Sequence, residues 1–166
     1  MGADKASLLV QGEPQAARIV RLLAEKGIAT TTLGREPVIG ASFLPDEEEF
    51  AGPVSALRRF RPTADLVFVA SCDLPRFDPR LVDTLTERLG EADAAVPFVC
   101  GFRQPLCALY RGSLFSRIGE GDCAMSLLEG LNVRLVDDEE LRSSGIDPLS
   151  TQGANTPEEL QEALSL

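Results

Sequence analysis

Residues 65–75 read DLVFVASCDLP, and this stretch indicates the class of fold more clearly than any other. The run from Leu66 to Ala70 is apolar without interruption, which is typical of a strand buried on both faces of a parallel sheet. The turn that follows carries Asp73, so a carboxylate stands just past the carboxyl end of that strand. In open α/β sheets ligands bind outside the carboxyl ends of the strands, so we expect Asp73 to face a ligand site.

Strands and helices alternate on both sides of this stretch, which predicts an α/β fold with a mostly parallel sheet and helices on both faces. Strands are predicted at 28–33, 38–44, 65–71, 94–99, 105–110 and 133–137. Helices are predicted from Pro14 to Gly27, over 53–60, from Asp78-Pro79 onward, near 112–118 and 122–130, and from Pro157 onward. The strands within 94–110 are expected to be antiparallel, because their connection is too short for a parallel crossover. Pro97 weakens the assignment of its strand, since proline has no N–H for a ladder.

The size and charge of the chain limit what it does. Its 166 residues, with no repeats and no low-complexity linker, predict a single domain over residues 1–166. The net charge of −10 argues against nucleic-acid binding, which needs a basic surface. The acidic runs at 46–49 and 137–140 are interpreted as solvated loops. No apolar run approaches the ~18 residues of a membrane span, and no secretory signal is recognised, so we expect a cytoplasmic protein that does not bind membranes.

The chain has no histidine and four cysteines. Without histidine, a histidine general base or a histidine-containing triad is excluded. The cysteines are not paired at CxxC spacing, so a zinc site is not expected, and the thiols are predicted to be reduced and mostly buried.

Four positions could contribute to a nucleotide site, although some of them could instead have a purely structural role. Asp73 could hold Mg²⁺ beside bound phosphates, or it could only organise its turn. Lys5 could pair with phosphate oxygens, or it could be an ordinary surface lysine. Gly52 could bring the backbone close to a ligand, and Asn155 could simply cap the last helix.

Five segments, taken in order, resemble segments of one known family. They are MGADKASLL (1–9), FAGPVSAL (50–57), SCDLPRFDPRLV (71–82), RQPLCALYR (103–111) and GANTPEEL (153–160). They are similar to the family patterns LAGGxSxRMGxDKxxL, xxGPLAGL, PCDxPxxPxxLV, QPLCALYR and NVNTPEEL. The chain is therefore identified as resembling the molybdenum cofactor guanylyltransferases, the MobA-type nucleotidyltransferases.

This resemblance implies a Rossmann-like, three-layer nucleotidyltransferase fold. It implies transfer of GMP from Mg²⁺-bound GTP to molybdopterin, which yields molybdopterin guanine dinucleotide and pyrophosphate. Lys5 would contact the GTP phosphates, Asp73 would hold Mg²⁺, and Asp46 and Gly52 would lie near the nucleotide. The resemblance places Gln104, Pro105 and Asn155 on the pterin side, and other molybdenum cofactor maturation proteins are possible partners.

The chain departs from the family pattern in two main places. The family has a first strand, in the middle of the sheet, and the LAGGxSxR loop before the position of Met1. We therefore expect Met1 to be an interior position of the family pattern, and activity of residues 1–166 alone to be absent. The second departure is Gly153-Ala154, which replaces Asn-Val and removes one amide from the expected pterin side.

Other functions stay open on the sequence alone. One is a non-catalytic protein that binds a nucleotide or pterin during molybdenum cofactor maturation. Another is an interaction protein that uses the fold as a scaffold. A third is a cytidylyltransferase or another nucleotidyltransferase, because the residues that select the base are not identified in the sequence.

Overall fold

The computed structural model describes residues 9–10, 12–46, 52–119, 121, 123–154 and 156–165. The α-helices are α1 (Gln15–Glu25), α2 (Gly52–Arg59), α3 (Arg80–Leu89), α4 (Asp138–Ser143) and α5 (Pro157–Ser165). The 3₁₀ helices are η2 (Gly112–Ser116), η3 (Ala124–Leu128) and η4 (Pro148–Thr151). The strands are β1 (Leu9–Val10), β2 (Glu13–Pro14), β3 (Thr31–Gly34), β4 (Ser42–Pro45), β5 (Leu66–Ala70), β6 (Ala94–Val99), β7 (Phe102–Arg103), β8 (Cys107–Arg111) and β9 (Val133–Asp137).

The main sheet is mixed rather than mostly parallel. Strand β8 lies between β5 and β6 and is antiparallel to both, while β7 is antiparallel to β6 and β9 is parallel to β6. The short return through β7 into β8 reverses the chain direction, since no helix intervenes to carry it across the sheet. The expectation of an antiparallel pair within 94–110 is confirmed, and β5, β6 and β9 all run in the same direction.

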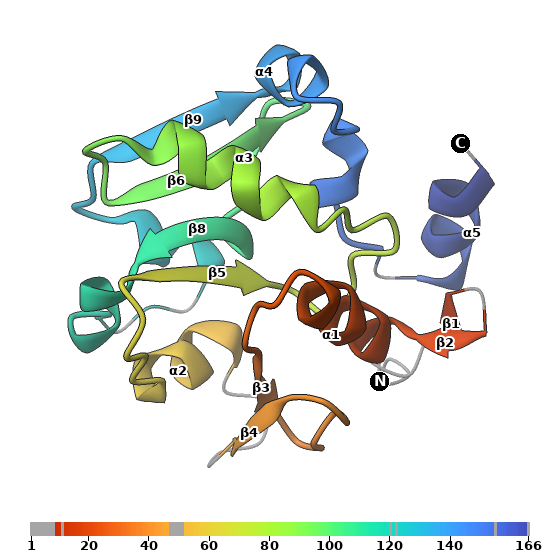
Figure 1. Ribbon diagram of the computed structural model, residues 1–166, viewed down its shortest axis with the longest axis horizontal. Helices are drawn as coiled ribbons and strands as arrows, with labels where there is room; N and C mark the ends of the chain where they lie inside the picture. The colour runs from red at the N-terminus through yellow and green to blue at the C-terminus, as the bar shows by residue number, and fades with distance from the viewer. Residues whose placement is uncertain are drawn as a thin grey trace.

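The sheet carries helices on both faces, as expected for a three-layer α/β fold (Figure 1). Side chains of β6 and β8 alternate between two apolar cores, because successive residues of a strand point to opposite faces. The first core contains Ala95 and Leu109 and is covered by α1, α3 and α4. The second contains Ala94 and Tyr110 and is covered by α2, η2 and η3. Both faces of the sheet are therefore buried, in agreement with the apolar strand sequences.

The strand that contains Pro97 forms as predicted, and it lies inside the sheet. Strand β6 pairs with β9 along one side, and with β8 and then β7 along the other. Pro97 falls between the residues that pair with β8 and those that pair with β7, and its carbonyl accepts the Gln104 N–H at 2.9 Å. Proline is tolerated here because its missing N–H faces the side of the strand where the partner changes.

Three further segments differ from the expectation. The helices predicted near 112–118 and 122–130 are the short 3₁₀ helices η2 and η3. The acidic run at 137–140 is not a loop: Asp137 caps α4, and Asp137 and Glu140 form a capping box. Acidic side chains at a helix N-terminus are stabilised by the helix dipole and by free N–H groups, so the run starts a helix. In the other run, residues 47–49 lie outside the described residues.

Strands β3 and β4 form a parallel pair that is separate from the main sheet (Figure 1). Leu33 of β3 nevertheless packs against the second core. Within the described ranges, β5 pairs with β8 along one edge and with no strand along the other. No helix in the described part of the chain is both long enough and apolar enough to cross a membrane.

Candidate functional site

The candidate site is built around Asp73, in the turn that follows β5. The Asp73 side chain is half-buried, and its Oδ1 accepts a hydrogen bond from the Ser71 hydroxyl at 2.5 Å. Ser71 is the first residue after β5, so the strand orients the hydroxyl and the hydroxyl then orients the carboxylate. None of the ion pairs found among the described residues includes Asp73. The carboxylate therefore keeps acceptor capacity for a ligand.

Two backbone hydrogen bonds bring distant segments to this turn. The Ser71 N–H donates to the Leu106 carbonyl at 2.7 Å, which places the loop before β8 beside the end of β5. The Ala154 N–H donates to the Asp73 carbonyl at 2.9 Å, which places the segment before α5 on another side. Three segments from different parts of the sequence therefore meet at the carboxyl end of β5.

Hydrogen bonds from β8 fix the backbone of the loop that carries Gln104 and Pro105. The Cys107 N–H donates to the Gln104 carbonyl at 3.0 Å, and the Tyr110 hydroxyl donates to the Pro105 carbonyl at 2.7 Å. Burial raises the pKa of the Tyr110 phenol, and the nearby Cys107 thiol raises it further, so the hydroxyl keeps its proton at neutral pH. The loop is thus a fixed part of the site, next to Ser71.

Gly153 lies directly against the Asp73 carboxylate. A Cβ added at Gly153 would be 3.0 Å from Oδ1, 3.1 Å from Cγ and 3.2 Å from Oδ2 of Asp73. The sequence suggested only that Gly153 removes an amide from the pterin side. The structure adds that a side chain at this position would press on the carboxylate.

The residues present fit a magnesium ion that is shared with phosphate. Magnesium prefers oxygen ligands, and in nucleotide sites it takes one or two carboxylates and completes its shell with phosphate oxygens and water. Asp73 offers one such carboxylate, which the Ser71 hydroxyl orients and against which Gly153 packs. In the described ranges, no cluster of three or more cysteine, aspartate or glutamate side chains is arranged to hold a metal by itself.

The remaining predicted site residues are not tied to the Asp73 turn by contacts of the described residues. Asp46 follows β4, where its N–H donates to the Gly34 carbonyl at 2.8 Å. Gly52 begins α2 with φ of 79°, a backbone conformation that favours glycine. The contacts of the described residues do not join either of them to the Asp73 turn. Lys5 and Asn155 lie outside the described residues, so their roles stay predictions.

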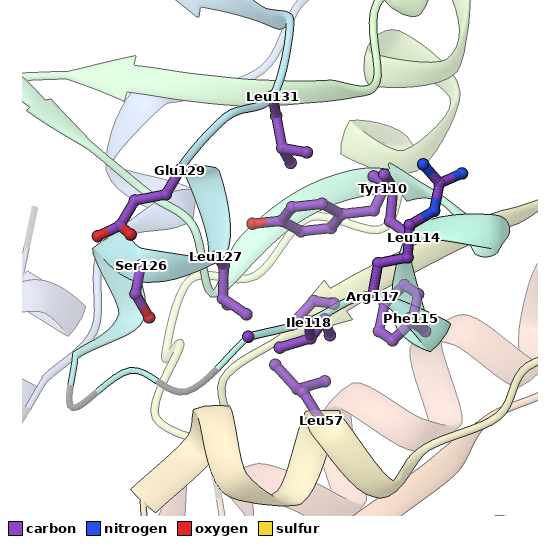
Figure 2. Close-up of a pocket in the computed structure, with 12 residues that line it drawn as sticks. Leu57, Tyr110, Leu114, Phe115, Arg117, Ile118, Ser126, Leu127, Glu129 and Leu131 are labelled. Carbon is purple, nitrogen blue, oxygen red and sulfur yellow. The ribbon is translucent and has the colours of Figure 1, made fainter.

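A separate pocket lies on the face of the sheet covered by α2, η2 and η3 (Figure 2). Its wall is mostly apolar and includes Leu57, Tyr110, Leu114, Phe115, Ile118 and Leu131. None of the predicted site residues lines it. The site is therefore assigned to the strand end with its oriented carboxylate, and not to this hollow.

Sequence reasoning found Asp73 but missed the two residues that shape its surroundings. The sequence predicts Ser71 only as the last residue of the strand, although a serine hydroxyl two residues before an aspartate can donate a hydrogen bond to its carboxylate. No signal in the sequence places Gly153 beside Asp73, because 80 positions separate them in the chain. This proximity is a tertiary feature.

The chain is similar to known proteins in sequence and in fold. A probable molybdenum cofactor guanylyltransferase from Natronomonas pharaonis is 30% identical over 122 residues, which are 65% of this chain and 59% of that protein. The chain thus matches less than two thirds of the length of this curated relative.

Two solved structures show the same fold at low sequence identity. Molybdopterin-guanine dinucleotide biosynthesis protein A from Archaeoglobus fulgidus superposes with a TM-score of 0.75 at 24% identity, over 98% of this chain and 89% of that one. 2-C-methyl-D-erythritol 4-phosphate cytidylyltransferase from Thermus thermophilus superposes with a TM-score of 0.70 at 19% identity, over 99% of this chain and 93% of that one.

The sequence model of one family covers most of the chain. The family is described as the MobA-like NTP transferase domain, and the match spans residues 1–140. This match includes the Asp73 turn and the loop at Gln104 and Pro105. The chain therefore belongs to the MobA-like NTP transferase family.

Proposed function

We propose that the protein transfers GMP from Mg²⁺-bound GTP to the terminal phosphate of molybdopterin, which forms molybdopterin guanine dinucleotide and releases pyrophosphate. The observation that carries the proposal is the Asp73 carboxylate, which Ser71 holds at the carboxyl end of β5 between two converging segments. The resemblance of five ordered segments and the name of the Natronomonas pharaonis relative support guanylyl transfer to this acceptor.

The chemistry needs positioning more than acid–base catalysis. A phosphate oxygen of molybdopterin attacks the α-phosphorus of GTP, the new P–O bond forms, and the bond to the β-phosphate bridging oxygen breaks so that pyrophosphate leaves. The nucleophile is already an anion, so no general base is required, and the absence of histidine is consistent with this reaction. The barrier lies in bringing two anionic phosphates together in line.

The residues of the chain take separate parts in this positioning. Asp73 would hold Mg²⁺, which supplies charge neutralisation for the phosphates when it is bound. Lys5 is proposed to contact the GTP phosphates, and Asp46 and Gly52 to lie near the nucleotide. Gln104, Pro105 and Asn155 are proposed to face the pterin, because the loop at Gln104 and the segment at Ala154 flank the Asp73 turn.

A second candidate function is cytidylyl transfer to another phosphate acceptor. The same fold occurs in the cytidylyltransferase from Thermus thermophilus, so the fold alone does not select the base. A non-catalytic role, in which the protein binds nucleotide or pterin during molybdenum cofactor maturation, also stays open. Other maturation proteins are proposed as partners, and the cytoplasm is proposed as the location. Comparing GTP with CTP distinguishes the transferases, and the absence of turnover together with measurable binding favours the non-catalytic role.

The test measures pyrophosphate release with molybdopterin, Mg²⁺ and GTP or CTP. The protein is assayed as residues 1–166 and also extended at its N-terminus by a strand and the LAGGxSxR loop. We expect turnover with GTP in the extended protein, and a loss of about 100-fold or more in Asp73→Asn. Asp65→Asn is the matched control, because Asp65 is an exposed aspartate at the opposite end of β5. Equal rates in the two variants would refute the role of Asp73.

A further inference from the structure

Gly153 is in closer contact with the Asp73 carboxylate than an ordinary residue could be. An added Cβ would meet all three carboxylate atoms at 3.0–3.2 Å, a separation shorter than ordinary van der Waals contact. Gly153 is not among the glycines with positive φ. Its backbone conformation is therefore open to other residues, and the three atoms nearest to an added Cβ all belong to the carboxylate.

The Asp73 carboxylate is not free to move away. Its Oδ1 accepts from the Ser71 hydroxyl at 2.5 Å, and Ser71 is itself fixed by its N–H bond to the Leu106 carbonyl. The segment of Gly153 is fixed as well, because the next residue, Ala154, donates to the Asp73 carbonyl at 2.9 Å. A side chain at 153 would therefore have to break the Ser71 bond, turn the carboxylate or separate the two segments.

We infer that Gly153 is a positioning residue, whose missing side chain lets the Asp73 carboxylate keep the orientation set by Ser71, in which it would take a divalent cation that is shared with phosphate oxygens. This inference rests on the proposed function, because it assumes that Asp73 is a metal ligand. It assigns Gly153 to the metal side of the site, whereas the sequence suggested only the loss of an amide toward the pterin.

Ser71 and Gly153 act on the same carboxylate from two sides, so their effects must be coupled. When Ser71 is replaced by alanine, the carboxylate loses its hydrogen bond and can turn away from a new Cβ. The cost of Gly153→Ala is then expected to shrink in the Ser71→Ala background. Groups that share a partner show such non-additivity, whereas independent changes in distant parts of the fold add.

The experiment titrates residues 1–166, and the same protein extended at its N-terminus by a strand and the LAGGxSxR loop, with Mn²⁺ in the presence of GTP, and follows binding by water proton relaxation. We expect Gly153→Ala to raise the Kd of Mn²⁺ roughly tenfold, as is typical when the orientation of a metal ligand is disturbed. Gly119→Ala is the matched control, because Gly119 also lacks a positive φ and an added Cβ there meets no atom within 4 Å. Thermal unfolding of each variant is measured alongside, so a loss of affinity is separated from a loss of folding.

The outcomes separate the inference from the proposed function. If neither form of the wild type binds Mn²⁺ with GTP, or if Asp73→Asn binds as tightly as the wild type, the metal role of Asp73 fails and the inference fails with it. If Asp73→Asn weakens binding but Gly153→Ala behaves like Gly119→Ala, the inference alone is overturned. A tenfold loss in Gly153→Ala that shrinks in the Ser71→Ala background supports it, and purely additive losses overturn it.

Discussion

Replacing Gly112 by alanine tests whether β8 anchors the strand that presents Asp73. Gly112 is buried immediately after β8, and its N–H donates to the Asp65 carbonyl at the amino end of β5 at 2.7 Å. A Cβ added here would lie 2.0 Å from the Ala64 carbonyl oxygen and 3.2 Å from its carbon. Both are backbone atoms, so no side-chain rotation relieves the overlap.

The cost follows from the movement that the overlap requires. The Cβ and the oxygen must separate by about 1 Å to reach the shortest contacts that real structures show, and such a shift takes the 2.7 Å bond beyond hydrogen-bonding range. Overpacking costs about 1–3 kcal/mol. An unsatisfied buried amide costs about 1–3 kcal/mol more. We therefore expect Gly112→Ala to lower the free energy of unfolding by about 3 kcal/mol.

Urea denaturation followed by far-UV circular dichroism measures this change. With an m-value of about 2 kcal/mol/M, the midpoint is expected to fall by about 1.5 M. Gly119→Ala, in the same segment of the chain but with open space around an added Cβ, is expected to change stability by less than about 0.5 kcal/mol. Equal midpoints for the two variants would refute the close approach of Gly112 to Ala64 and the packing derived from it.

Two further predictions concern cysteine reactivity and acid stability. The prediction that the thiols are mostly buried is wrong, because Cys107 is buried but Cys72, Cys100 and Cys123 are exposed. Burial raises the pKa of the Cys107 thiol, so a chromogenic disulfide at pH 8 is expected to label three thiols in the native protein and a fourth only in denaturant. Four rapid labels in the native protein would contradict this. Hydrogen bonding from Arg134 lowers the pKa of Glu140 against the opposing effect of desolvation. A lowered folded-state pKa stabilises the protein above the unfolded-state pKa and loses this effect as the pH falls through the folded-state pKa. Glu140→Gln is therefore expected to be less stable than the wild type at pH 7 but not well below pH 4, measured by thermal unfolding; a stability difference that does not change with pH would contradict this.

The fold was predictable where the apolar residues of one short segment indicated which residues are buried. The extents of β6 and β9 agree with the sequence, because apolar runs bounded by turn residues define strands. The final helix begins as expected, with the Thr156 hydroxyl accepting from the Glu159 N–H at 3.1 Å. The mostly parallel character of the sheet is not confirmed among the described residues, because β8 runs against β5 and β6. The acidic run at 137–140 was wrong as a loop. Both features depend on which elements meet in space.

By itself, the sequence determined that this chain is an α/β protein with a carboxylate at the end of its most apolar strand, and its ordered segments indicated a MobA-type nucleotidyltransferase. These features were accessible because side-chain periodicity and short motifs are local properties of the chain. Only the tertiary structure decided what surrounds Asp73: the Ser71 hydroxyl, the loop at Leu106 and the close approach of Gly153. Such contacts join residues up to 80 positions apart, and packing between elements sets them, which no local pattern records.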